Sequence, residues 1–217
     1  MGREPMPSIF VTLGMSYYIR VLGTGDPDIH PDHLKDALAR QGLEARLEPD
    51  DDDEPEQWRV INVENTGGQA LVQIERNPVV AGRLGMAELT EFRELIREHQ
   101  PKTAMEWLQV FFDKVSVIYA FQVLNMASAD NNFEIVSAIR TAIWDRTGGI
   151  LQNDNEGFTN EDGFHILWQF DGDATGDKYC AVLDGQGSWV RFRMDLGDPF
   201  QRMAFLGGEV PQTAVRL

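Results

Sequence analysis

The spacing of hydrophobic positions predicts alternating strands and helices in the first half of the chain. Residues 16–22 are rich in aromatic and β-branched side chains, which favours a strand. Leu34, Ala37 and Leu38 lie on one face of a helix, and Gly42 ends it. The two patterns together predict strands at 16–22, 43–47, 58–63 and 69–74, the last two as a hairpin, and helices at 31–41 and 87–99.

The second half shows the same alternation. Ala104, Leu108 and Phe111 recur at helical spacing after Pro101, and an apolar-rich run at 115–123 suits a buried strand. The predicted elements are helices at 101–114, 132–147 and 199–206 and strands at 115–123, 150–152, 165–170, 179–183 and 189–194.

This order of elements predicts an α+β fold with mixed or antiparallel sheets and helices packed on one face. The helix face of Leu34 and Leu38 recurs 105 positions later as Ile139 and Ile143, and a glycine follows both helices. The recurrence favours an internal duplication of a βαβββα-like unit, and chance similarity of two helix faces is the alternative. We expect one compact globular unit that consists of a loose leader at 1–14, a first half at 15–100, a linking helix at 101–114 and a second half at 115–217.

The composition narrows the class of protein. The 217 residues include 35 acidic and 19 basic side chains, which give a formal net charge of −16, and a single cysteine. One cysteine excludes a disulfide framework. The acidic charge makes nucleic acid and anionic membranes poor partners, because phosphate binding requires clustered Lys and Arg. The start of the chain has no signal-peptide pattern and no apolar run reaches the length of a membrane span, so we expect a cytoplasmic protein.

The acidic residues are concentrated in two segments. Residues 50–56 contain six acids and no base. Residues 147–177 contain seven acids and no Lys or Arg. Solvated loops that keep the protein soluble are the simplest interpretation. The functional interpretation is an acidic surface that attracts a basic partner or holds a cation.

No complete catalytic or metal-binding motif occurs. His165 begins a predicted strand, and Cys180 lies within another, which suits a buried thiol. Asp171-Gly172-Asp173 begins like a calcium loop, but Val182 stands where the bidentate acid of such a loop is required. We therefore predict neither a metal ion nor a cofactor.

The leading hypothesis is a non-enzymatic acidic protein that binds a basic protein partner, for example an intracellular inhibitor or immunity-type protein. The partner-binding residues predicted for it are acids of two loops and one aromatic anchor: Asp154, Glu156, Glu161 and Asp162 with Phe158 as the anchor, and then Asp50, Asp51, Asp52 and Asp53. Phe158 has a second interpretation, in which it packs into the core. The alternatives for the whole protein are a hydrolase or ligand-binding enzyme that uses His165 with loop carboxylates, and a structural homodimer that associates through a sheet face of the second half.

Overall fold

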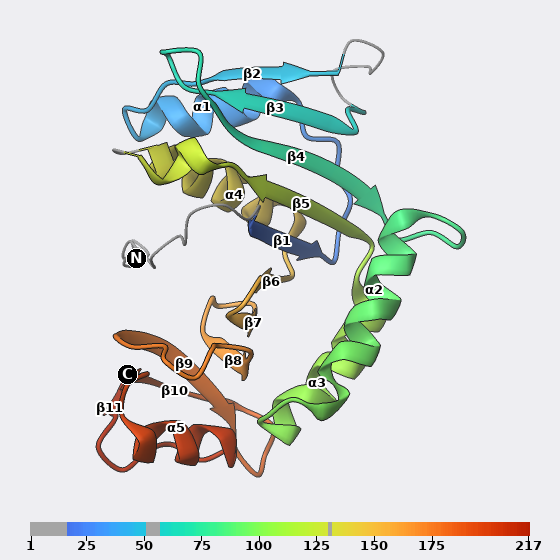
Figure 1. Cartoon of the computed structure of the whole chain (residues 1–217). Helices are drawn as coiled ribbons and strands as arrows, with labels where there is room; N and C mark the ends of the chain where they lie inside the picture. Colours follow the sequence, from blue (N-terminus) through green and yellow to red (C-terminus); the bar gives the residue numbers. More distant parts are fainter. Residues whose placement is uncertain (1–16, 51–56, 130–131) are drawn as a thin grey trace.

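The computed structural model describes residues 17–50, 57–129 and 132–217. Within these ranges, eleven strands form one sheet in the order β11-β10-β9-β8-β7-β6-β1-β5-β4-β3-β2 (Figure 1). The strands are β1 (Tyr17–Gly23), β2 (Arg46–Pro49), β3 (Val60–Glu64), β4 (Ala70–Pro78), β5 (Val117–Val123), β6 (Ile150–Asn153), β7 (Gly157–Thr159), β8 (His165–Trp168), β9 (Asp177–Leu183), β10 (Trp189–Asp195) and β11 (Val215–Arg216).

Helices connect the strands in both halves. In the described ranges they are α1 (Pro31–Arg40), α2 (Leu84–Leu95), α3 (Lys102–Phe111), α4 (Asn132–Thr147) and α5 (Pro199–Leu206), with 3-10 turns η1 (Ile96–Glu98), η2 (Phe112–Lys114) and η3 (Asn125–Ser128). Helices α1 and α5 begin at proline, whose missing N–H would have had no partner within the helix. None of the described helices is long and apolar enough to cross a membrane.

The predicted α+β class with a mixed sheet is confirmed. Strands β8 and β9 pair in parallel through His165 and Cys180, and the other described pairs are antiparallel. The helices cover both faces of this sheet, whereas the sequence placed them on one. Helices α1 and α4 pack on one face with the central strands, and α2 and α3 pack on the opposite face.

Strand β5 shows why both faces need a cover. Its alternate residues Tyr119 and Phe121 belong to the core that contains α1 and α4, whereas Ile118, which points to the other face, belongs to the core of α2 and α3. A strand with apolar side chains on both faces has to be buried on both. The continuous apolar run that predicted β5 therefore also required two layers of helices.

The two halves of the chain share one sheet because β1 lies between β5 and β6. Strand β2, which follows α1, lies at the edge of the sheet, whereas β6, which follows α4, lies beside β1. The two acidic segments follow these two strands and therefore leave the sheet at places five strands apart. Internal duplication and the four segment boundaries stay predictions.

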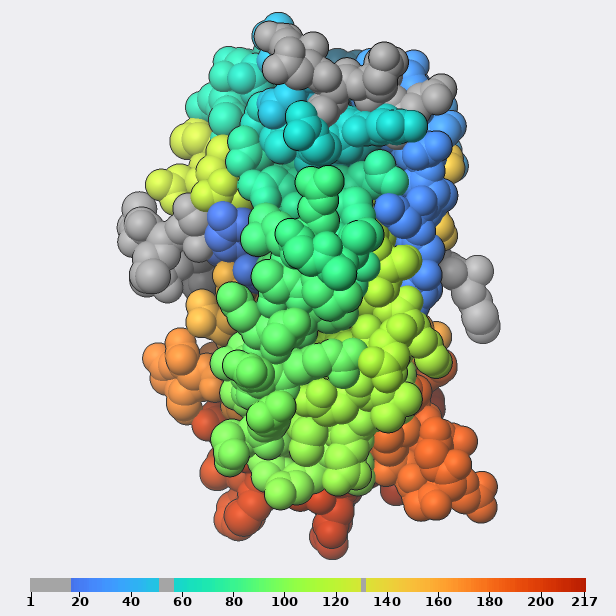
Figure 2. Space-filling model, turned by 90° about the vertical axis from the view of Figure 1, so that its right-hand side faces the viewer, coloured from blue at the N-terminus to red at the C-terminus, as the bar shows by residue number. Residues whose placement is uncertain are grey.

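The C-terminal strands form a separate layer with α5. Phe192 and Met194 of β10 pack with Phe205 of α5 and with Cys180 of β9. Figure 1 shows α5 at the lower end of the molecule, below β9 and β10. Figure 2 shows α2 and α3 running down the side of the molecule, with the C-terminal part projecting beneath them. The opposite side of β10 therefore has only partial cover, from α3.

Candidate functional site

Asp154, the first predicted partner-binding acid, is engaged inside the molecule. Its carboxylate accepts a hydrogen bond from Nη1 of Arg20 at 2.6 Å and another from the backbone amide of Tyr18 at 3.1 Å. Arg20 also pairs with Glu88 of α2 and donates to Gln152 of β6 at 2.8 Å. Asp154 thus connects the end of β6 to β1, and it shares the charge of Arg20 with Glu88.

Glu156 lies in the turn between β6 and β7 and is buried. Its Oε2 accepts hydrogen bonds from Nζ of Lys178 at 2.7 Å and from the amide of Asn153 at 3.1 Å. The side chains of Glu156 and Lys178 are only 11% and 10% exposed, so little of this ion pair reaches solvent. A buried pair of this kind links β9 to the turn across the two strands between them.

Tyr17 and Arg140 lie near this ion pair, on the face of the sheet that α4 covers. Burial, and next the negative charge of Glu156, raise the pKa of the Tyr17 hydroxyl, so it stays protonated. Burial lowers the pKa of Arg140, which Tyr17 and Glu156 partly offset. Among the described residues, Nε of Arg140 and Oδ1 of Asn153 have no hydrogen-bond partner. The group is a buried polar cluster that joins β1, α4, β6 and β9.

Phe158, the predicted aromatic anchor, is fully buried at 0% exposure. Its ring meets Phe92 of α2 and Phe112 of η2 at centroid distances of 5.6 and 5.8 Å. The preceding Gly157 has φ +118, and a Cβ there would lie 2.0 Å from the carbonyl oxygen of Leu167, so the hairpin accepts only glycine at this point. This tight turn directs Phe158 inward. The core interpretation of Phe158 therefore describes the structure, and the ring has no surface for a partner.

The remaining predicted acids differ in exposure. Asp162 pairs with Arg191 of β10, and Glu161 beside it is exposed. Asp50 is exposed, and its backbone amide donates to Val60. Asp51, Asp52 and Asp53 lie outside the described residues. The structure therefore brings no group of these acids together on one surface.

His165, on which the hydrolase alternative depends, lies in the core. It is 1% exposed and packs between the rings of Phe170 and Phe205. Burial, and next the charge of Lys178, hold its pKa well below the usual value, so the imidazole is neutral. Cys180 beside it is buried, which raises the pKa of the thiol to about 12. These positions give neither side chain access to a substrate.

The loop that begins like a calcium site is exposed and open. Asp171 and Asp173 point away from the core, while Arg202 of α5 donates to the carbonyl oxygens of Gly172 and Ala174 at 2.8 and 3.3 Å. Within the described ranges, no group of three or more His, Cys, Asp or Glu side chains has metal-binding geometry. The loop is instead fastened to α5 by an arginine.

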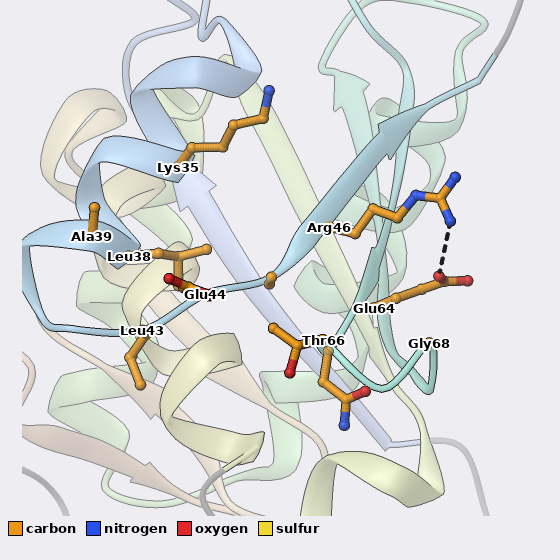
Figure 3. A pocket seen from close by; sticks show the side chains of 11 residues that line it. Lys35, Leu38, Ala39, Leu43, Glu44, Arg46, Glu64, Thr66 and Gly68 are labelled. Carbon is orange, nitrogen blue, oxygen red and sulfur yellow. Dashed lines mark ion pairs between the residues drawn. The ribbon is translucent and has the colours of Figure 1, made fainter.

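A pocket of about 530 Å³ opens between α1 and the turn that joins β3 to β4 (Figure 3). Leu38 and Leu43 line one side, while Arg46 and Glu64, 3.8 Å apart, line the other. Lys35 at the rim already pairs with Asp32 at 2.8 Å. The charged groups around this pocket are satisfied by one another, so it presents no side chain poised for chemistry.

The surface that the sequence did not reveal lies on α5. Phe200 and Met203 are 76% and 64% exposed, one helical turn apart on the same side. Exposed or half-exposed carboxylates lie at the start of the helix and in the loop that Arg202 joins to it. We call this surface the α5 patch, and it consists of Phe200, Met203, Asp171, Asp173 and Asp198.

Hydrogen bonds hold the α5 patch in place. Asp198 caps the helix by accepting from the amides of Phe200 and Gln201, and the Arg202 guanidinium ties the 171–177 loop to the helix. Asp195 accepts from the amide of Gly197. The sequence contained one indication of this surface. Phe200, Met203 and Leu206 lie on a different side of the helix from Phe205, so the side with Phe200 is left outside when Phe205 faces the core.

Comparison with known protein families, with curated proteins and with solved structures finds no match to this chain. The evidence for the candidate site is therefore the geometry of the folded chain alone.

Proposed function

We propose that this protein is a non-enzymatic interaction module that binds a basic protein partner through the α5 patch. The exposure of Phe200 and Met203 on a helix that Asp198 caps and that is joined to the acidic 171–177 loop is the observation that supports this function. Protein interfaces commonly combine an apolar centre with a polar rim. Large aromatic side chains that are left exposed on a folded domain also mark docking surfaces.

The two parts of the α5 patch have separate roles in this proposal. Phe200 and Met203 supply affinity, since full burial of one such side chain contributes about 1.5–3 kcal/mol. Asp171 and Asp173 supply attraction at a distance, which raises the association rate and weakens as salt is added. The guanidinium of Arg202 donates to backbone carbonyls next to these carboxylates, so its single charge offsets part of theirs.

The α5 patch suits this role better than the loop at 154–162. There, Asp154, Glu156 and Asp162 each pair with a base of the same molecule. The pairs of Asp154 and Glu156 are partly or almost wholly buried, so a partner would have to break them and would gain little Coulomb energy. An inhibitor of a basic effector protein is the concrete form of the proposal.

Photo-cross-linking from position 200 tests the proposal. A benzophenone amino acid replaces Phe200, and the same replacement at Val110 serves as the control, because Val110 is 65% exposed on α3. We expect a basic protein to be captured from the native host at position 200 and not at 110. With that protein purified, Phe200→Ser should weaken binding at least about tenfold.

Charge variants separate the two roles. The double variant Asp171→Asn/Asp173→Asn should slow association and flatten its dependence on salt, with little change in dissociation. The matched control is Glu91→Gln/Glu94→Gln on α2, where both acids are exposed. Capture of a neutral or acidic protein, or equal effects of the two double variants, would refute the proposed function.

A further inference from the structure

The side of β10 that faces away from α5 forms a second open surface. Its residues alternate along neighbouring strands, so they lie on one side of the sheet. We call it the β10 face, and it consists of Phe164, Tyr179, Arg191, Arg193, Val215 and Leu217, with Asp162, Asp177 and Asp195 at its rim. Val215 and Leu217 are 51% and 63% exposed.

Aromatic and cationic groups are stacked at the centre of the β10 face. The guanidinium of Arg191 lies 5.2 Å from the centroid of the Phe164 ring, and that ring meets Tyr179 edge to face at 6.4 Å. Arg191 pairs with Asp162, and Nη1 of Arg193 lies 3.4 Å from Asp177. These contacts hold flat, partly apolar side chains against the sheet while their outer surfaces face solvent.

The charges of the β10 face nearly balance, which contrasts with the chain as a whole. Two arginines stand beside three carboxylates, whereas the full sequence has a net charge of −16. Two copies of so acidic a chain repel each other over most of their surfaces. A nearly neutral face with both signs is a place where they can meet with little of that repulsion.

We propose that two copies of this chain associate through their β10 faces. A twofold axis through the face sets the arginines of one copy over the carboxylates of the other, so the surface complements itself. Burial of Val215, Leu217 and the exposed parts of Tyr179 supplies the apolar contact. The α5 patch cannot serve this purpose, because its carboxylates would face carboxylates.

The association goes beyond the proposed function and uses a different surface. Phe192 and Met194 point from β10 toward α5, while Arg191 and Arg193 point the other way. Pairing through the β10 faces therefore leaves both α5 patches open. A dimer would present two docking surfaces, which raises the avidity for a partner that has repeated sites.

Analytical ultracentrifugation across the micromolar range tests the association. We expect a monomer–dimer equilibrium for the full chain. Arg193→Glu alone and Asp177→Arg alone should each weaken dimerisation at least about tenfold. An equimolar mixture of these two variants should form a heterodimer within about threefold of the original affinity, since opposite charges again face each other across the axis.

Arg83→Glu is the matched control, because Arg83 is exposed beside α2, away from the β10 face. Equal weakening by Arg83→Glu would mean that net charge alone governs association and would overturn the proposal, as would a monomer at every concentration. Rings beside arginines can also stack single-stranded nucleic acid. Binding of a labelled single-stranded oligonucleotide that is lost in Tyr179→Ala, without self-association, would equally overturn it. Failure here leaves the α5 cross-linking test unaffected.

Discussion

Strands β5 and β10 each have seven residues and differ in what covers them. Six residues of β5 are buried, because helices pack on both of its faces, whereas β10 buries alternate residues against α5 only. Their sequences reflect this: Tyr-Ala-Phe in the middle of β5 is apolar throughout, while Arg-Phe-Arg in β10 alternates. The comparison teaches that this fold keeps its doubly covered core around β5 and leaves exposed side chains around β10, where both proposed interaction surfaces lie.

The largest effect on stability is expected at Phe158, which is buried against Phe92 of α2 and Phe112 of η2. Phe158→Ala should lower the free energy of unfolding by about 4 kcal/mol, because it leaves a cavity between two other aromatic rings. Phe200→Ala, on the exposed side of α5, is the matched control and should change it by less than about 0.5 kcal/mol. Urea denaturation measures both. Similar losses in the two variants would erase the distinction between core and docking aromatics.

A somewhat smaller effect is expected from the buried ion pair. Lys178→Met should lower the free energy of unfolding by about 3 kcal/mol, because it leaves the Glu156 carboxylate buried without its cation. The double variant Lys178→Met/Glu156→Gln should recover much of that loss. Denaturant unfolding of the three variants forms the measurement, and a double variant no more stable than Lys178→Met would show that the pair is not the cause.

The smallest effect is a dependence of stability on pH, which arises from His165 beside Phe205 of α5. The folded-state pKa of His165 lies below its unfolded value, so the unfolded chain binds the proton more tightly. Stability is therefore complete above a pH of about 6.5 and falls below it, by at most about 1.4 kcal/mol per pH unit. His165→Phe should flatten this slope in thermal unfolding, and His33→Gln on the exposed side of α1 should not.

Local patterns predicted much of the fold. The apolar runs, the hairpin at 58–74 and the segments at 165–170, 179–183 and 189–194 correspond to described strands, and the stripe at Leu34 and Leu38 corresponds to α1. The last three segments do not form a purely antiparallel meander, because β8 and β9 pair in parallel. The position of β1 between β5 and β6 could not be predicted, because it depends on pairing between distant segments. Strand β7 was missed, since three residues are too few to show alternation.

The candidate site was harder to predict than the fold for a physical reason. Residues 147–177 contain acids without bases, which suggested an acidic surface. In the folded chain, Arg20, Lys178 and Arg191 come from other segments and pair with three of those acids. Charge that is separated along a sequence can be neutralised in space, so segment counts do not locate a surface. The exposure of Phe200, set by packing of α5 on β10, locates one instead.

The central place of β1 also affects how the chain reaches this structure. Tyr17 pairs with Val123, 106 positions later, and Ile19 pairs with Asn153, 134 positions later. During synthesis, one edge of β1 can therefore be paired only after β5 has emerged, and the other only after β6. Contacts so distant in sequence slow folding, and an unpaired strand edge invites aggregation in the meantime. Of the described strands, β1 is thus the earliest in the chain, yet its second edge can be paired only after β2 to β5 have been made.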